Sequence, residues 1–153
     1  MLGELKVLKE NDKLVLKIRN AEKLHGHLGP FLVIGVRMGI LAKRILNANA
    51  GESNKLRVTA KLPLLTPFSC IVDGIQATTQ CTVGNQKLRI ENSQAQIIVC
   101  FELQNSDKTL KVQVNPKIID ELKNRYSKGS SNEELAWEIA SIPESQLFTI
   151  ENQ

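Results

Sequence analysis

Residues 28–46 read LGPFLVIGVRMGILAKRIL, the longest apolar stretch of the sequence and the one that decides the fold. A helix accepts proline in its first turn, where the missing N–H has no intrahelical partner, so Pro30 predicts a helix that starts there. The residues that follow are apolar on almost every side, which is typical of a helix buried in a core or a subunit interface. Gly35 and Gly39 permit another element to approach closely. That element is either a neighbour within the domain or a second copy of the chain.

The segment before this helix has two interpretations. Asn11-Asp12 can cap a helix that Gly26 ends, with apolar or partly apolar residues at near-helical spacing: Leu14, Ile18, Ala21 and His25. The alternation of Leu14, Leu16 and Ile18 is also typical of a strand. Both interpretations remain open from the sequence.

The middle of the sequence is rich in strands. Alternating apolar residues predict strands at 56–62, at 88–90 and at 95–103, and a turn at Asn105-Ser106-Asp107 precedes an antiparallel neighbour at 110–114. Residues 69–79 predict a helix that carries Ile71, Ile75 and Thr78 on one face and Asp73 with Ala77 on another. After Cys81 we expect a tight loop, with Gly84 and Asn85 suited to positive φ.

The last part of the chain, residues 116–153, predicts a helical tail. One helix follows Asn115-Pro116 and ends at Lys128-Gly129, and a capping box from Ser131 to Glu134 opens another that Pro143 ends. The expected fold class is α+β: a single domain over residues 1–153, with a two-layer, antiparallel-rich mixed sheet packed against helices.

Composition excludes several classes of protein. The 153 residues suit one domain, and 20 Lys+Arg against 16 Asp+Glu give a net charge of +4 that is spread along the chain. Aromatic residues make up 4%, so we expect no nucleic-acid partner. Three cysteines do not suggest a disulfide scaffold, and charged residues (Arg37, Lys43 and Arg44) interrupt the apolar stretch. With no apolar leader at the N-terminus, the expected setting is the reducing cytoplasm without membrane association.

Four side chains in two segments are the candidate metal ligands. Both histidines fall in His25-Gly26-His27, where a flexible glycine can turn two imidazoles to one side. Cys70 opens the predicted helix 69–79 and Cys81 follows it. Imidazole and thiolate suit zinc, and two of each can make a tetrahedral site, although the spacing is not that of a zinc finger. The alternative is one histidine that caps a helix end and one that is exposed.

The residues around these ligands suggest further roles. At a helix N-terminus the positive end of the dipole stabilises thiolate, so Cys70 is expected to ionise readily. Asp73 either orients a histidine ligand or is a surface carboxylate. Cys100 falls within a predicted strand and is expected to be a packing residue.

These motifs resemble a known family. Residues 25–31 (HGHLGPF) and 35–39 (GVRMG), then 69–76 (SCIVDGIQ) and 79–85 (TQCTVGN), are similar in type and order to the signature of the FmdE-like family of formylmethanofuran dehydrogenase proteins. The resemblance covers about residues 20–115.

Three features depart from the family pattern. Gly29 stands where many members have Cys, Gln80 precedes Cys81, and the Gly84-Asn85 loop is short. The C-terminal zinc-binding extension of longer members has no counterpart, because no CxxC follows Cys100.

The resemblance implies an α+β domain related in fold to the catalytic domain of glyceraldehyde-phosphate dehydrogenases. It also implies a homodimer with a His/Cys cluster that can hold a metal. The family is associated with a molybdenum or tungsten oxidoreductase complex of one-carbon metabolism, and the resemblance assigns no reaction to this chain.

The leading hypothesis is therefore a metal-binding homodimeric domain, with zinc or another divalent transition metal held by His25, His27, Cys70 and Cys81. A second is a metal-free thiol enzyme or redox domain that uses Cys70 or Cys81, with Asp73 as a further catalytic candidate and hydroxyl donors from Thr78, Thr79 and Thr82. A third is a non-catalytic accessory subunit of a larger oxidoreductase.

Overall fold

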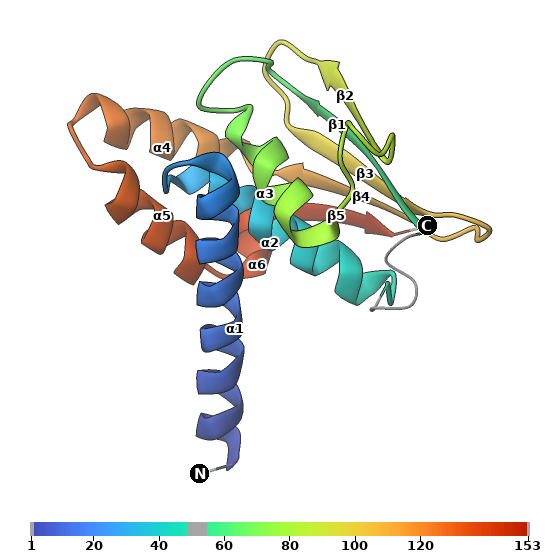
Figure 1. The fold of residues 1–153 in the computed structure, drawn as a ribbon. Coiled ribbons are helices and arrows are strands. Elements are labelled where there is room, and N and C mark those ends of the chain that lie inside the picture. Colours follow the sequence, from blue (N-terminus) through green and yellow to red (C-terminus); the bar gives the residue numbers. More distant parts are fainter. Residues whose placement is uncertain (1, 49–54, 153) are drawn as a thin grey trace.

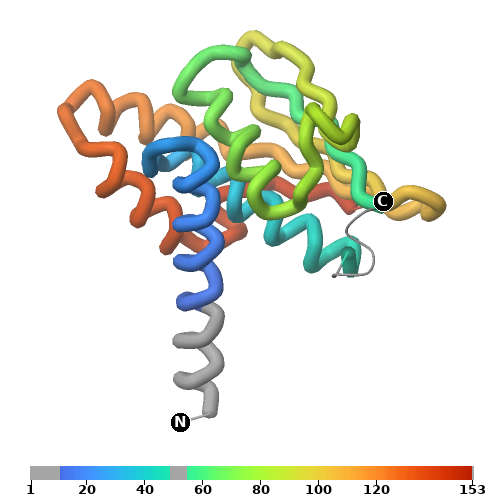
Figure 2. The backbone as a smooth tube through the Cα atoms, viewed as in Figure 1, coloured from blue at the N-terminus to red at the C-terminus, as the bar shows by residue number. Residues whose placement is uncertain are grey.

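The computed structural model describes residues 2–48 and 55–152, with side chains from residue 11 onward. The helices of this part of the chain are α1 (Leu2–His25), α2 (Pro30–Ile45), α3 (Cys70–Thr79), α4 (Pro116–Ser127), α5 (Asn132–Ser141) and α6 (Glu144–Leu147). The strands are β1 (Leu56–Leu62), β2 (Leu88–Asn92), β3 (Ile98–Leu103), β4 (Thr109–Val114) and β5 (Phe148–Asn152) (Figure 1). Figure 2 follows the chain from α1 and α2 through the sheet to α4 and α5, which return beside the first helices.

The strands form one mixed sheet in the order β2-β1-β3-β4-β5. β1 and β2 are parallel, and the other three pairs are antiparallel. Ala60 pairs with Val99, Val99 with Val112, and Val112 with Ile150, so apolar residues form a row across four strands. The predicted α+β class and the antiparallel-rich mixed sheet are confirmed.

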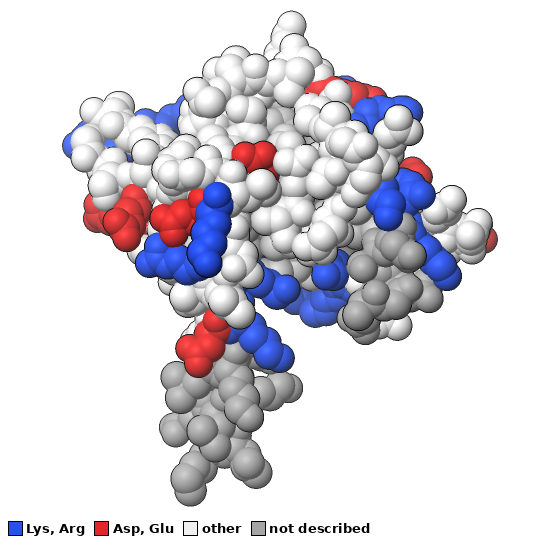
Figure 3. All heavy atoms as spheres, viewed as in Figure 1, with Lys and Arg blue, Asp and Glu red and all other residues white. Residues whose placement is uncertain are grey.

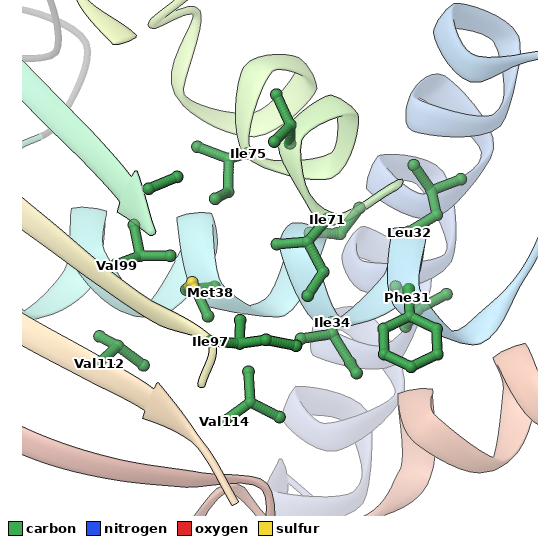
Figure 4. Close-up of a cluster of buried hydrophobic side chains, with 14 of the residues drawn as sticks. Phe31, Leu32, Ile34, Met38, Ile71, Ile75, Ile97, Val99, Val112 and Val114 are labelled. Atoms are coloured by element: carbon green, nitrogen blue, oxygen red, sulfur yellow. The ribbon is translucent and has the colours of Figure 1, made fainter. Parts of the chain in front are cut away.

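The helices cover one face of this sheet. Val99 and Val112 are fully buried on that face, whereas Lys111, one residue along β4, is exposed. Side chains of α2 and α3 fill the space beneath the strands, as Figure 4 shows for Met38 and Ile75. The α2 helix is buried along most of its length, as its apolar sequence predicts.

The contact between α2 and α3 is a close approach of two backbones. A Cβ atom built on Gly35 would overlap the carbonyl oxygen of Ile71, and one built on Gly74 would overlap the carbonyl oxygen of Leu32. One turn further along α2, a Cβ atom built on Gly39 would overlap the side chain of Thr78. Positions later in α2 thus contact positions later in α3, so the two helices run in the same direction. Of the two interpretations of these glycines, packing within the domain is therefore the one observed.

The charged residue inside the apolar helix has a structural role. The Arg37 guanidinium donates hydrogen bonds to the carbonyl oxygens of Ile139, at 2.8 Å, and of Ile142, at 2.5 Å, at the end of α5. Burial lowers the pKa of Arg37, although an arginine stays charged. The side chain thus satisfies carbonyl groups that a helix end leaves without intrahelical donors.

Three expectations from the sequence are corrected. Of the two interpretations of residues 14–18, the helix is confirmed, but the cap proposed at Asn11-Asp12 is wrong, because α1 begins at Leu2. The tail after residue 116 is not wholly helical: α6 is one turn long, and β5 then pairs with β4. In the loop after α3, positive φ occurs at Gln80 and Gln86 rather than at Gly84 and Asn85.

Two further observations concern membrane-spanning helices and the distribution of charge on the surface. No helix of the described residues is long and apolar enough to cross a membrane. On the face drawn in Figure 3, basic and acidic side chains occur in several separate groups, with a largely uncharged area between them.

We predict that Gly35→Ala destabilises the protein by about 3 kcal/mol, because the added methyl group overpacks a site formed by backbone atoms that cannot rotate away. The matched control is Gly84→Ala, where the nearest neighbour of an added Cβ is Thr82 Oγ1 at 3.9 Å. Urea unfolding of both variants checks this. Equal midpoints for the two would contradict the close contact of α2 with α3.

Candidate metal centre

The His25-Gly26-His27 segment is the connection between α1 and α2. Gly26 adopts φ 99°, a conformation that glycine enters without steric cost, and its N–H donates to Glu22 O at 2.7 Å. This ends α1 directly after His25 and turns the chain toward Pro30, where α2 begins. The local sequence therefore holds both imidazoles at one end of the helical layer.

The first residue of α3 completes a cluster at the same end. His25, His27 and Cys70 each offer a ligand atom, and these atoms lie within 4.8 Å of one another. The two imidazole rings are 4.4 Å apart between centroids and tilted by 41°. In a tetrahedral zinc site, bond lengths near 2.0 and 2.3 Å separate ligand atoms by about 3.3–3.6 Å. Side-chain movements of about 1 Å bring the three atoms to that spacing.

Asp73 fixes the orientation of His25. Its Oδ2 atom lies 2.6 Å from Nδ1 of His25, and its Oδ1 atom accepts a hydrogen bond from Nε2 of Gln76 at 3.0 Å. The carboxylate favours a proton on Nδ1 and leaves the lone pair of the neutral ring on Nε2. Of the two roles considered for Asp73, orientation of a histidine is the one that the geometry supports.

His25 Nε2 is the atom that most directly indicates a ligand. It is buried, and no group of the described residues makes a hydrogen bond with it. Buried polar side-chain atoms nearly always have a partner, and an unsatisfied one costs about 1–3 kcal/mol. A metal ion bonded to Nε2 would remove that cost, so the residues present fit a metal.

The Cys70 thiol does not behave as its helix position predicts. Burial, and after it the negative charge of Asp73, raises the pKa of Cys70. These effects outweigh the stabilisation of thiolate expected at the start of α3. A metal-free Cys70 is therefore a thiol at neutral pH, and a bound cation would displace its proton.

The structure does not bring Cys81 to this cluster. Cys81 follows the C-terminal end of α3, a helix of 10 residues and so about 15 Å long, that begins at Cys70. It is fully buried, and its Sγ donates to the carbonyl oxygen of Leu56 at 3.3 Å. Burial raises the pKa of this thiol as well. Cys100 lies half-buried in β3, as expected of a strand residue.

The threonines suggested as hydroxyl donors are used by the helix itself. Thr78 donates to the carbonyl oxygen of Gly74 at 2.9 Å, and Thr79 donates to that of Ile75 at 2.6 Å. Thr82 accepts from the N–H of Asn85 at 3.1 Å within the following loop. These hydroxyl groups stabilise α3 and the loop at the end that is remote from the histidines.

A cavity of about 540 Å³ adjoins the cluster, with His27 and Cys70 in its wall. Tyr126 and Asn132 also line it, and the Tyr126 hydroxyl donates to Asn132 Oδ1 at 2.7 Å. Burial raises the pKa of Tyr126 to about 12, so this hydroxyl remains protonated. Neither residue is predicted from the sequence, because both lie far from the other motifs along the chain and nothing in their spacing connects them.

A relative of known sequence matches part of this chain. A protein of Archaeoglobus fulgidus described as a probable S-adenosyl-L-methionine-binding protein is 31% identical over 93 residues, which are 57% of this chain and 24% of that protein. This chain thus spans about a quarter of that relative's length.

A solved structure shares the fold. It is that of a tungsten formylmethanofuran dehydrogenase FmdE-like protein from Syntrophus aciditrophicus, with a TM-score of 0.62 and 20% identity. The match covers 94% of this chain and 71% of that one.

A family model matches residues 24–149, and its description reads FmdE, molybdenum formylmethanofuran dehydrogenase operon. The match includes both histidines in the turn after α1, all of α2 and α3, and the whole sheet except the end of β5. Since it spans most of the sequence, this chain belongs to the FmdE family.

Proposed function

We propose that this protein binds one divalent transition-metal ion, preferentially zinc, through His25, His27 and Cys70. The observation that carries the proposal is the buried Nε2 atom of His25, which has no hydrogen-bond partner in the described chain. His25 is also one of three residues, with His27 and Cys70, that offer ligand atoms within 4.8 Å of one another. The donor set of two imidazoles and one thiolate is one that zinc prefers.

Each ligand residue has a definable role in this proposal. His25 binds through Nε2 because Asp73 occupies its Nδ1 side at 2.6 Å. His27 is exposed and supplies a ligand from the open side of the site, and Cys70 supplies a sulfur atom from the buried side. Three protein ligands leave a fourth position for water or a small ligand, as in zinc sites that act on a bound molecule. An ion there would act as a Lewis acid on that molecule.

The pKa values of the two candidate thiols do not support the alternative of a metal-free thiol enzyme. Burial raises the pKa of both Cys70 and Cys81, whereas a reactive cysteine needs a lowered one. Binding of S-adenosyl-L-methionine is not part of the proposal, because the match to that relative covers 24% of its length.

The proposal also covers the cellular role of the protein. The family description names a formylmethanofuran dehydrogenase operon, which supports an accessory role beside that oxidoreductase. The proposed location, the cytoplasm, stays a prediction. The expected likeness to the catalytic domain of glyceraldehyde-phosphate dehydrogenases and the absence of a nucleic-acid partner stay predictions.

A homodimer is the proposed assembly. Three large apolar side chains of α1 are exposed, at 42% for Val15, 61% for Leu16 and 56% for Leu24. Another side of α1 packs on α3 and α2, with Ile18 and Ala21 fully buried (Figure 1). Helical spacing puts Val15 and Leu24 on opposite flanks of α1, and only Leu16 points directly away from the packed side. In the proposed dimer, the partner covers Leu16.

We predict that purified protein retains one metal ion per chain, and that Cys70→Ser or His27→Ala lowers zinc affinity more than about 100-fold, since each removes a ligand. Elemental analysis and competition with a chromogenic chelator measure both quantities. The matched control is Cys81→Ser, the same chemical change at a thiol outside the cluster, where a serine hydroxyl can still donate to Leu56 O. Loss of metal from Cys81→Ser but not from Cys70→Ser would overturn the assignment.

We predict that Asp73→Asn lowers zinc affinity about 10–100-fold, because the neutral amide no longer favours the proton on Nδ1 of His25. In the metal-free protein, ring ¹⁵N shifts of His25 should report a proton on Nδ1 in the wild type and a mixture of tautomers in the variant. Glu22→Gln is the charge-matched control, since Glu22 pairs with Arg19 at 2.8 Å instead. An unchanged His25 tautomer and unchanged affinity in Asp73→Asn would contradict the positioning role.

We predict that Leu16→Glu converts a dimer to a monomer, because it places a charge where the proposed partner covers an exposed leucine. Size-exclusion chromatography with light scattering reads out the mass before and after the change. Lys13→Glu on the same helix makes a larger charge change without removing an apolar side chain and should leave the dimer intact. A wild-type protein of 17.0 kDa in solution would refute the proposed assembly.

A further inference from the structure

The cavity beside the metal cluster has the dimensions of a small-molecule site. Its volume of about 540 Å³ falls within the range of about 300–1,000 Å³ that is usual for ligand pockets. His27 and Cys70 line it, so a molecule in the cavity would lie directly beside two of the three proposed ligands. The apolar side of the cavity is formed by Pro30, Phe31 and Pro67.

Three helices begin at this cavity. Pro30, Cys70 and Asn132 are the first residues of α2, α3 and α5, and all three line it. Because Gly29 has no side chain, it cannot cap the first amide groups of α2. The N-terminal end of a helix carries about half a positive elementary charge. The first turn of α3 carries Asp73 and that of α5 carries Glu133 and Glu134, which offset these two dipoles, whereas the first turn of α2 has no acidic residue. The attraction of the cavity for an anion would therefore come mainly from a cation held by the cluster, with the N-terminal end of α2 beside it.

The side chains that line the cavity add no negative charge of their own. None of the lining residues in the described part of the chain is an aspartate or a glutamate. The nearby Asp73 directs its two oxygens to His25 and Gln76. Phe68 packs edge-on against Phe31 with ring centroids 5.3 Å apart, and Lys123 Nζ lies 5.3 Å from the Phe68 centroid. The charge that this lysine adds beside the apolar wall is thus positive.

Polar groups of the wall are set up to donate hydrogen bonds. The Tyr126 hydroxyl donates a hydrogen bond to the side-chain oxygen Oδ1 of Asn132 at 2.7 Å. An asparagine whose oxygen is used has its two amide N–H donors to offer a ligand. No arginine or lysine lines the cavity among the described residues, so a dianionic phosphate would lack the paired cations it usually needs.

We propose that this cavity binds a small organic monocarboxylate, with its carboxylate at the metal and the N-terminal end of α2 and its apolar part against Phe31 and the prolines. This inference rests on the proposed metal site and specifies the class of molecule that occupies its open position. A carboxylate oxygen is a common zinc ligand, and the apolar wall accounts for the rest of the molecule.

The test compares hexanoate with hexanamide, which has the same chain and no charge, by calorimetric titration of zinc-loaded protein. We expect hexanoate to bind at least about tenfold more tightly, a difference of about 1.4 kcal/mol. Asn132→Asp should weaken hexanoate at least about tenfold and hexanamide less than about twofold, because it adds a negative charge without changing size. An acidic residue in the first turn favours α5, so this variant is expected to fold.

A second variant tests the location. Gly29→Leu should block both ligands, because its side chain fills the cavity, whereas Gly29→Ala should retain hexanoate, since an added Cβ meets Asn132 Oδ1 at an ordinary 3.5 Å. Equal binding of the two ligands, or hexanoate binding that Asn132→Asp and Gly29→Leu leave unchanged, would overturn the inference. If zinc is retained but neither ligand binds, the inference fails and the metal proposal stands. If zinc itself is not retained, both fail.

Discussion

The close contact of Gly35 with Gly74 is the constraint on which the rest of the structure depends. Neither residue has a Cβ atom, so the backbones of α2 and α3 touch, and a methyl group at either position would overlap a carbonyl oxygen of the other helix. Interiors are packed too densely to absorb such an overlap without backbone movement. The sheet packs on the same helix pair, so the core and the functional end of the molecule share one support.

The direction of this contact determines what meets at its ends. Because α2 and α3 run the same way, the residues before α2 come next to the first residue of α3. That places the His25-Gly26-His27 turn beside Cys70, although the two segments lie far apart along the chain. The same geometry carries Cys81 to the far end of α3, where burial under β1 makes it part of the core.

The sequence predicts most of the fold because its strongest signals are local. Pro30, the apolar run after it, and the alternation in β1 and β4 each specify an element without reference to the rest of the chain. The strand at residues 148–152 has only a short signal, the alternation of Phe148 and Ile150 with Thr149 and Glu151, which becomes recognisable as a strand beside its partner β4. The site residues likewise differ in whether a local pattern identifies them. Short motifs identify His25, His27 and Cys70, and helical spacing identifies Asp73. Tyr126 and Asn132 reach the cavity only through the packing of α4 and α5, which no local pattern predicts.

The two candidate cysteines show why spacing could not decide between them. Both flank α3, both are buried and in both burial raises the pKa of the thiol, so composition and solvation treat them alike. What separates them is the partner each one meets. Cys81 has a backbone carbonyl as its acceptor, which completes a hydrogen bond and requires nothing further. Cys70 instead meets two imidazoles, one of which has a buried nitrogen with no partner among the described residues. The Cys81 thiol thus has its hydrogen-bond acceptor within the fold, whereas His25 Nε2 is left unsatisfied at a cost of about 1–3 kcal/mol. The bonding capacity that the fold leaves unused therefore lies at the histidines, which is where a ligand can supply the missing bond.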